Sequence, residues 1–325
     1  MALSTQDFQA MLAEGNNDNL PGRMSNTTAR SLVRIVRRDA DLNFDLPNLK
    51  VRLEPENGIL WAIMKHPERA CYTPETMADL RELQLHLRRS FHGVDANDMP
   101  FRYLVWASEA PKAWSLGGDL LNFTSMIRSG DRDGLRDYAH LAIDILHDNY
   151  VALDLPIVTM ALIQGDAIGG GFEAMLTDDV VIAEEGAKFG LPEILFNLFP
   201  GMGAYSFLKR KLGETMARRL IEDGKTRSAA EAAELGLVNQ VCPTGGGEQA
   251  LRDYISSQRT KWRTTLTLQQ TQRRIDRISK RELLDVVDMW VDLAMELDPS
   301  DLRRMDCLAR VQTRKAVPTR QLQAV

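Results

Sequence analysis

Two glycine-rich segments of this 325-residue chain have the composition of turns that can bind negative charge. Residues 115–119 read SLGGD and residues 169–171 read GGG, and each segment follows an apolar run and precedes a helical pattern. Glycine lets the backbone approach a ligand closely, and the first N–H groups of a helix have no acceptor within it. Either segment alone is typical of an ordinary tight turn. Together they could supply two converging N–H groups, an oxyanion hole in which one donor contributes ~2.7–4 kcal/mol of transition-state stabilisation.

Two glutamates close to the second glycine segment could act as acid and base. Glu173 lies between Phe172 and Ala174, and Glu193 lies in the apolar sequence GLPEIL. Burial among such residues would raise a carboxyl pKa toward the range useful at neutral pH. Taken alone, either glutamate could equally form a salt bridge or lie exposed on a helix. The segment 195–203 (LFNLFPGMG) suits the wall of a pocket for a hydrophobic chain.

Other familiar catalytic patterns are absent from the sequence. It contains no G-x-S-x-G elbow, no G-x-x-x-x-G-K-[ST] phosphate loop and no H-E-x-x-H, and its five histidines are scattered. These absences argue against a serine hydrolase and a metalloenzyme. We therefore expect neither a metal site nor a cofactor.

Composition places the chain among soluble globular proteins, with 44% hydrophobic and 26% charged residues. Its longest clean apolar runs, such as 157–163, are too short to span a membrane, and its first residues do not read as a secretory signal. The three cysteines are widely separated, which fits a reducing compartment. We therefore expect a cytoplasmic protein. The net charge of −5 gives no reason to expect a nucleic-acid partner.

The elements that must position the glycines and glutamates alternate between strands and helices. Apolar periodicity and turn signals predict a β-hairpin over 49–64, strands over 101–107, 157–163 and 180–183, and helices over 119–129 and 133–150. This alternation is typical of an α/β architecture.

The two ends of the chain differ from its middle. Residues 1–45 are polar and aperiodic, which predicts an N-terminal extension, followed by a core over 46–255 and a helical C-terminal region over 256–325. The last region carries 14 Lys and Arg against 9 Asp and Glu, and its basic residues concentrate in 259–281. This basic segment is either a solvated helix face or a docking surface for an acidic partner or a phosphorylated ligand.

The spacing of LGGD, GGGFE and GLPE resembles the crotonase (enoyl-CoA hydratase/isomerase) superfamily. Longer segments are similar to one of its branches, the diffusible-signal-factor synthases, which make cis-2-unsaturated fatty-acid signals for bacterial quorum sensing. The similar segments are 162–174 (LIQGDAIGGGFEA), 182–186 (IAEEG), 190–196 (GLPEILF) and 199–207 (FPGMGAYSF), with shorter matches at 290–292, 294–295, 302–303 and 305–306. The resemblance covers roughly residues 48–315. It implies a spiral core of repeated ββα units followed by a helical C-terminal region.

The resemblance also implies roles for the residues at the matching positions. Glu173 and Glu193 would be the catalytic pair, with the N–H groups of Gly170 and of Leu116, or its neighbour Gly117, as the oxyanion donors. The implied reaction is dehydration of a 3-hydroxyacyl thioester, mainly one bound to acyl carrier protein. One glutamate takes the α-proton and the other protonates the departing hydroxyl, and the same site then hydrolyses the thioester to release the free acid.

Further positions follow from the same resemblance. Met202, Trp290 and Leu308 would line the acyl pocket. Lys112 lies where CoA-using crotonases often carry a basic residue that contacts CoA, so CoA thioesters stay open as substrates. The resemblance also implies a homotrimer or dimer of trimers, and a sensor-kinase receiver domain as a partner.

Two alternatives to a signal synthase remain open. One is an ordinary enoyl-CoA hydratase or isomerase acting on CoA thioesters. The other is a non-catalytic protein that only binds partners. The apolar segment 194–207 together with Trp290 favours the signal synthase, and retention of both glutamates and both glycine segments argues against a pure binding protein.

Overall fold

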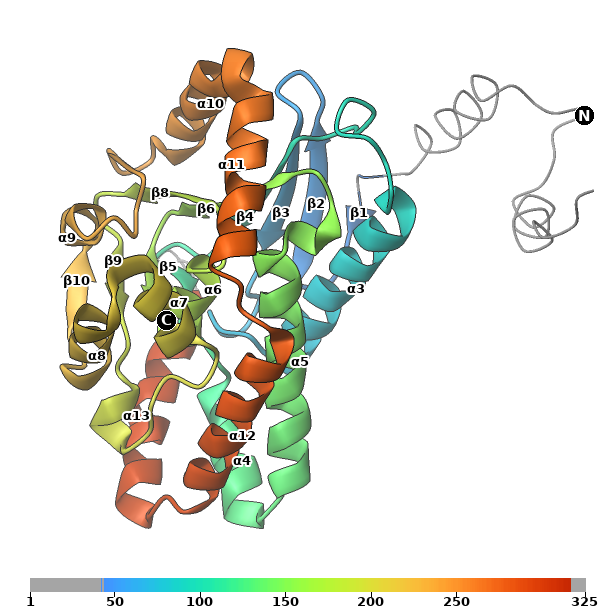
Figure 1. The fold of residues 1–325 in the computed structure, drawn as a ribbon. Coiled ribbons are helices and arrows are strands. Elements are labelled where there is room, and N and C mark those ends of the chain that lie inside the picture. The colour runs from blue at the N-terminus through green and yellow to red at the C-terminus, as the bar shows by residue number, and fades with distance from the viewer. Residues whose placement is uncertain (1–41, 43, 317–325) are drawn as a thin grey trace, which may run out of the picture. The chain divides into compact units, whose positions relative to one another are not determined.

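The computed structural model describes residue 42 and residues 44–316 of the chain. Most of the predicted N-terminal extension, 1–45, therefore lies outside the described residues. The described part contains two β-sheets surrounded by helices (Figure 1).

The larger sheet has seven strands among the described residues, in the order β1-β2-β3-β4-β6-β8-β11. The strands are β1 (Phe44–Asp45), β2 (Leu49–Glu54), β3 (Ile59–Met64), β4 (Tyr103–Ser108), β6 (Val158–Ile163), β8 (Val180–Glu184) and β11 (Gln240–Cys242). β2 and β3 pair antiparallel, which confirms the predicted hairpin, and from β3 to β11 all neighbours are parallel. Every residue of β4, β6 and β8 is buried, as expected for parallel strands covered on both faces.

The smaller sheet has four strands in the described part of the chain, in the order β10-β9-β7-β5. They are β5 (Ala113–Ser115), β7 (Asp166–Ile168), β9 (Lys188–Gly190) and β10 (Thr226–Ser228). β5, β7 and β9 run parallel, and β10 pairs antiparallel with β9.

The two sheets are built together by a repeated path of the chain. In the pairs β4–β5, β6–β7 and β8–β9, the first strand enters the larger sheet, the second enters the smaller sheet, and helical turns follow. These are the expected ββα units of a crotonase-type spiral core. The fold class predicted from the sequence is therefore confirmed, including the helical C-terminal region.

Several of the described helices begin at a residue whose side chain caps the first turn. Thr73 caps α3 with Pro74 at its first position, Asp119 caps α4, and Ser228 forms a capping box with Glu231 at α9. The α-helices described are α3 (Pro74–Phe91), α4 (Leu120–Ser129), α5 (Arg132–Tyr150), α6 (Gly170–Met175), α7 (Ala204–Leu212), α8 (Glu214–Glu222), α9 (Ala229–Glu234), α10 (Gly247–Gln258), α11 (Trp262–Ile275), α12 (Lys280–Met295) and α13 (Pro299–Ala316). Short 3₁₀ turns are η1 (Ala152–Asp154), η2 (Glu193–Phe196) and η3 (Arg259–Lys261).

α10 and α11 cover one face of the larger sheet. Leu251 and Ile255 of α10 and Trp262 of α11 pack in one buried cluster with the strands, and the Trp262 ring lies 5.1 Å from that of Tyr103. None of the helices in the described part is both long and apolar enough to cross a membrane.

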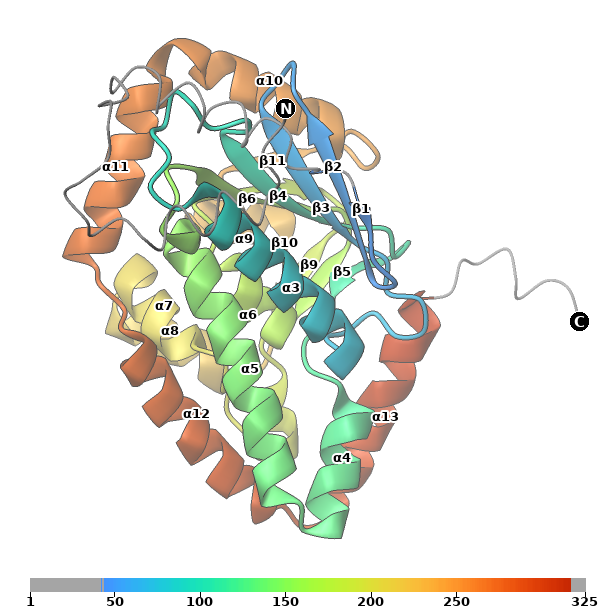
Figure 2. The same cartoon turned by 90° about the vertical axis from the view of Figure 1, so that its right-hand side faces the viewer.

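α12 and α13 return along the helices that follow β5. Figure 2 shows α12 beside α5 and α13 beside α4. Arg136 of α5 pairs with Asp288 of α12 at 2.9 Å, and Arg128 of α4 pairs with Asp306 of α13 at 2.6 Å. Ion pairs this exposed contribute only about 0–1 kcal/mol each, so apolar packing must hold the two C-terminal helices in place. A boundary between core and C-terminal region at residue 255 stays a prediction.

Candidate active site

The two glycine segments lie side by side because they follow neighbouring parallel strands. Residues 116–119 continue from β5 and residues 169–171 from β7, and such strands end at the same edge of a sheet. A Cβ atom on Gly117, whose φ is +82°, would lie 2.6 Å from the Gly170 nitrogen. A Cβ on Gly171 would lie 2.1 Å from the Ser115 carbonyl oxygen. Glycine at these positions is what lets the two segments touch.

In the first glycine segment, the N–H group of Gly118 has no acceptor among the described residues. The other N–H groups from 116 to 120 all donate: Leu116 to the Ala70 oxygen at 2.7 Å, Gly117 to Ser115 Oγ at 3.3 Å, Asp119 to Tyr138 Oη at 3.2 Å, and Leu120 to Gln312 Oε1 at 3.3 Å.

The second segment offers a matching donor. The Gly170 N–H likewise has no acceptor in the described part of the chain, and a Cβ on Gly170 would lie 3.4 Å from the Gly118 nitrogen. Two adjacent, unused N–H groups, one just before the N-cap of α4 and one at the first residue of α6, have the geometry of an oxyanion hole. The structure thus keeps Gly170 as a candidate but corrects the second donor. The candidate second donor is Gly118, because the N–H groups of Leu116 and Gly117 are already engaged.

Glu173 is buried on α6, one turn after Gly170, with 1% of its surface exposed. Its Oε1 accepts a hydrogen bond from the Ala204 N–H at 2.9 Å, at the start of α7. Burial raises the pKa of Glu173 to about 7, against the smaller lowering effect of backbone donors at Ala204 and Met202.

Glu193 begins the 3₁₀ turn η2, and its carboxyl group lies against the second glycine segment. A Cβ on Gly169 would lie 2.7 Å from Glu193 Oε1, while Oε2 is buried without a partner in the described structure. Burial raises the pKa of Glu193 well above its ordinary range, and the negative charge of Glu173 raises it further. Burial therefore disfavours the ionised form of both carboxyl groups, and at Glu193 the charge of Glu173 adds to this effect.

Both glutamates and both donor glycines face one cavity of about 290 Å³. Its apolar wall includes Met202, Trp290 and Leu308, the three residues expected to line an acyl pocket. Trp290 of α12 is 7% exposed, and its ring lies 5.3 Å from that of Phe123 on α4. The cavity is thus bounded on one side by the C-terminal helices.

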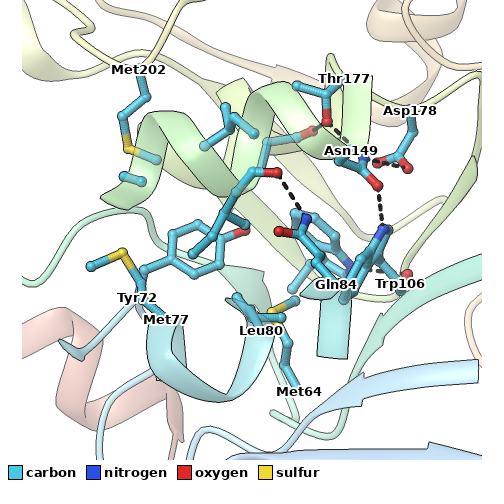
Figure 3. Close-up of a pocket in the computed structure, with 15 residues that line it drawn as sticks. Met64, Tyr72, Met77, Leu80, Gln84, Trp106, Asn149, Thr177, Asp178 and Met202 are labelled. Carbon is cyan, nitrogen blue, oxygen red and sulfur yellow. Dashed lines mark hydrogen bonds between the residues drawn. The ribbon is translucent and has the colours of Figure 1, made fainter. Parts of the chain in front are cut away.

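A second, smaller cavity of about 40 Å³ adjoins the first, because Met202 and Ala142 line both. Figure 3 shows Met202 at one end of this inner cavity and a hydrogen-bonded polar group at the other. In that group Asn149 donates to Thr177 Oγ1 at 2.8 Å and to Asp178 Oδ1 at 3.1 Å. Most of the remaining wall is apolar, including Met64, Met77, Leu80 and Leu146, and Gln84 also lines the cavity.

Lys112 does not line the cavity. Its side chain is exposed, and its backbone oxygen accepts from the N–H of Asp166, a residue that does line the cavity, at 3.2 Å. None of the basic residues in 259–281 lines the cavity either. Several of them form ion pairs within this chain, such as Lys280 with Asp144 at 2.6 Å.

Sequence reasoning missed three residues of the site, namely Gly118, Phe123 and Gln312. Phe123 could have been found from the apolar stripe of its helix. Gly118 was within the segment singled out, but which N–H remains unused depends on distant partners. Nothing in the sequence around Gln312 indicates contact with a segment about 190 residues earlier.

Comparisons with known proteins agree with this geometry. The model of the Enoyl-CoA hydratase/isomerase family matches residues 72–316. A probable enoyl-CoA hydratase of Mycobacterium bovis, echA8, is 47% identical over 85 residues, which are 26% of this chain and 33% of the relative. The chain spans about a third to a half of the length of the curated relatives it matches.

Solved structures match over a longer range. An enoyl-CoA hydratase from Bacillus halodurans aligns with a TM-score of 0.66 at 21% identity, covering 80% of this chain and 99% of that one. DspI of Pseudomonas aeruginosa aligns with a TM-score of 0.59 at 26% identity, covering 84% of this chain and 100% of that one. With its fold, its paired glutamates and a family match over most of its length, the chain belongs to the enoyl-CoA hydratase/isomerase family, the crotonase superfamily that its motifs resemble.

Proposed function

We propose that this protein dehydrates a 3-hydroxyacyl thioester and then hydrolyses the product to release a cis-2-unsaturated fatty acid. The observation that supports this most is the pair of buried carboxyl groups with raised pKa values beside two unused N–H donors in an apolar cavity. The carboxyl pair can remove one proton and deliver another, and the donors can stabilise an oxyanion. The segments similar to signal synthases support the cis-2 product.

The dehydration step uses both functions of the site. The thioester oxygen accepts from the N–H groups of Gly118 and Gly170, which stabilises the enolate formed when the ionised carboxylate takes the α-proton. The protonated carboxyl group then gives its proton to the 3-hydroxyl, the C–O bond breaks, and water leaves as the C2–C3 double bond forms. One proton has entered the pair and one has left, so the pair again holds a single proton.

The hydrolysis step reuses the same groups. An ionised glutamate takes a proton from water, and the resulting hydroxide attacks the thioester carbonyl carbon. The two N–H donors stabilise the tetrahedral oxyanion, and the C–S bond breaks as the thiol leaves with the proton. The products are the free acid and the carrier thiol.

A second candidate function is that of a general enoyl-CoA hydratase. It is favoured by the family model and by the names of the curated relatives. The same carboxyl pair would add water to a trans-2-enoyl-CoA and leave the thioester intact.

We expect the purified protein to release a free cis-2 acid from a 3-hydroxyacyl-carrier-protein substrate. Mass spectrometry of the acids and thioesters, after separate incubations with the carrier-protein and CoA substrates, distinguishes the candidates. An equilibrium mixture of 3-hydroxyacyl-CoA and trans-2-enoyl-CoA without free acid would contradict the proposal and support a hydratase. A Glu173→Gln and Glu193→Gln double variant is the control for uncatalysed hydrolysis.

The inner cavity suggests how chain length is selected. We propose that the acyl tail passes Met202, a flexible side chain, and ends before the polar group at Asn149, Thr177 and Asp178. An apolar tail cannot replace the hydrogen bonds of that group, so the group marks the end of the space.

A bulkier residue at Ala142 is expected to shorten the preferred chain. Ala142 is 1% exposed and lines both cavities, so leucine there would fill the passage between them. For substrates with the longest accepted acyl chains, kcat/KM should fall about 10–200-fold, which is the usual effect of one methylene in a hydrophobic pocket. Substrates with short acyl chains should react as before. Ala139→Leu, one turn earlier on α5 and lining only the outer cavity, should weaken all chain lengths alike. Equal profiles for the two variants over a series of chain lengths would contradict the tail assignment.

We also propose that the acyl group is carried by acyl carrier protein or CoA, and that Lys112 contacts this carrier. A receiver domain as partner, a homotrimer or dimer of trimers, and a cytoplasmic location are further proposals. No basic residue of the segment 259–281 lines the cavity, so this segment has no part in the proposed chemistry.

A further inference from the structure

Gln312 connects the C-terminal helix α13 to the first glycine segment. It is 2% exposed, and its Nε2 donates to the carbonyl oxygen of Leu116 at 3.1 Å and to that of Gly118 at 2.7 Å. Its Oε1 accepts from the Leu120 N–H at 3.3 Å. Both hydrogens and the oxygen of one buried amide are thus used on a single segment of backbone.

These bonds fix the peptide groups on both sides of the Gly118 N–H. A peptide group is planar, so a carbonyl held in place also fixes the N–H of the next residue. The carbonyl of Gly117, which shares its plane with the Gly118 N–H, accepts from the Tyr72 N–H at 2.8 Å. Gln312 holds the carbonyl groups of Leu116 and Gly118, which lie before and after that of Gly117. Three consecutive peptide groups are therefore held, and the Gly118 N–H is left directed at the cavity.

The backbone of this segment would be free to turn without such restraint. Gly117 has a positive φ and no side chain, so its peptide groups have little intrinsic preference for one orientation. The carbonyls of Leu116 and Gly118 would also lack their buried partner, which is unfavourable unless they rotate toward water or the cavity. Gln312 itself lines the cavity, so a rotated carbonyl could place its oxygen where the substrate oxygen must lie.

We propose that Gln312 is a positioning residue that keeps the Gly118 N–H aimed at the thioester oxygen. It does not take part in proton transfer, and it acts through the backbone of the first glycine segment. The inference rests on the thioester chemistry proposed above, but only on the oxyanion hole, and not on the identity of the product.

The test uses Gln312→Met, which has similar size and cannot make these hydrogen bonds, and cinnamoyl-CoA as a probe. Hydrogen bonds to the carbonyl of this conjugated thioester shift its absorption to longer wavelength. We expect the full-length wild type to produce the shift and Gln312→Met to lose most of it. With a substrate that turns over, kcat should fall about 10–100-fold, which is no more than the decrease caused by removing one oxyanion donor. KM should change little.

The matched control is Asn48→Leu. Asn48 is also buried, 7% exposed, and lines neither cavity, and its Nδ2 donates to Asp79 Oδ2 of α3 at 3.1 Å. This variant should lower the melting temperature to a similar extent yet keep both the spectral shift and kcat. A merely structural role for Gln312 would make the two variants behave alike.

A second variant covers the case in which Gln312→Met does not fold. Gln312→Glu keeps the length and the acceptor for Leu120 but, when ionised, removes both donors to the carbonyls. It should lose the spectral shift at pH 8. A folded Gln312 variant with the full shift and wild-type kcat would overturn the inference while leaving the proposed function standing. Absence of the shift in the wild type would overturn the oxyanion hole, and with it both.

Discussion

Replacing Glu173 or Glu193 by glutamine is expected to reduce turnover by at least about 10²–10⁴-fold, the usual contribution of one acid or base. Glutamine has nearly the same shape, but it can neither take nor give a proton. The measurement is the rate of dehydration of a 3-hydroxyacyl thioester by each single variant. Wild-type rates in either variant would contradict the two-carboxyl mechanism.

The same substitutions are expected to stabilise the folded protein at pH 8. The pKa of Glu173 is about 7 in the folded state against an ordinary value of 4.5, so between these values the folded state binds more protons than the unfolded state. Stability of the wild type therefore decreases as the pH rises through this window, and it stays lower above it. Glutamine has no charge to bury, so the variant does not lose folding stability in this way as the pH rises. Melting temperatures from pH 5 to 8 should fall less steeply for Glu173→Gln than for the wild type.

Glu54 provides a control, because its pKa shift is opposite in sign to that of Glu173. It is also buried, but hydrogen bonds from Arg252, Asn57 and Trp61 outweigh the effect of burial and lower its pKa to about 2. Its ionised form is stabilised in the folded state, and this stability is present at neutral pH and lost in acid. Glu54→Gln should therefore destabilise the protein at pH 8 and leave catalysis unchanged in the folded fraction.

The two raised pKa values also predict a bell-shaped pH dependence of kcat/KM. Below about pH 7 Glu173 becomes protonated, no carboxylate remains to take the α-proton, and activity falls. At high pH Glu193 also ionises, and no acid remains to protonate the leaving hydroxyl.

Gly117→Ala is expected to have the second large effect, at least about 10²–10³-fold on kcat/KM, comparable with the loss of one oxyanion donor. The new Cβ would lie 2.6 Å from the Gly170 nitrogen and 3.0 Å from the Ile168 oxygen. The two glycine segments must then separate, so the N–H groups of Gly118 and Gly170 no longer converge. Steady-state rates and the cinnamoyl-CoA absorption shift would both report this change.

Gly130→Ala separates this steric effect from backbone strain. Gly130 ends α4 with φ +74°, close to the value at Gly117, but a Cβ there meets nothing within 4 Å. Both variants carry the ~1–2 kcal/mol penalty of an L-residue in the left-handed region. Only Gly117→Ala should lose catalysis. If both variants lost stability and neither lost rate, the oxyanion hole would not lie between these segments.

The sequence predicted those parts of the site that depend on local chain geometry. Glu173 lies one turn after Gly170 on the same helix, so the motif places both, and the strands before the two glycine segments were evident from their apolar runs. The second donor was not predictable in this way. The Leu116 N–H is engaged by Ala70, which comes from a distant part of the chain, and the Gly117 N–H is engaged by Ser115 Oγ, whose orientation the motif does not specify.

The shape of the pocket was beyond sequence reasoning for a similar reason. Met202, Trp290 and Leu308 were expected from the resemblance and do line one cavity, but its walls come from five helices (α4, α5, α6, α12 and α13), the turn η2, strands β7 and β10, and the loops between them. Ala142 and Met202 line both the inner and the outer cavity, and Ala142, unlike Met202, does not stand out in the sequence.

The bond between Gly118 and Gln312 has a consequence for the time at which the protein becomes active. The two residues are 194 positions apart, so at 5–20 residues per second the ribosome needs about 10–40 s to add the second after the first. During that interval both glutamates and both glycine segments have been synthesised, but the first glycine segment still lacks its hydrogen bonds to Gln312. A nascent chain therefore carries both glutamates and both glycine segments before it carries the residue that completes the hydrogen bonding around the second candidate donor.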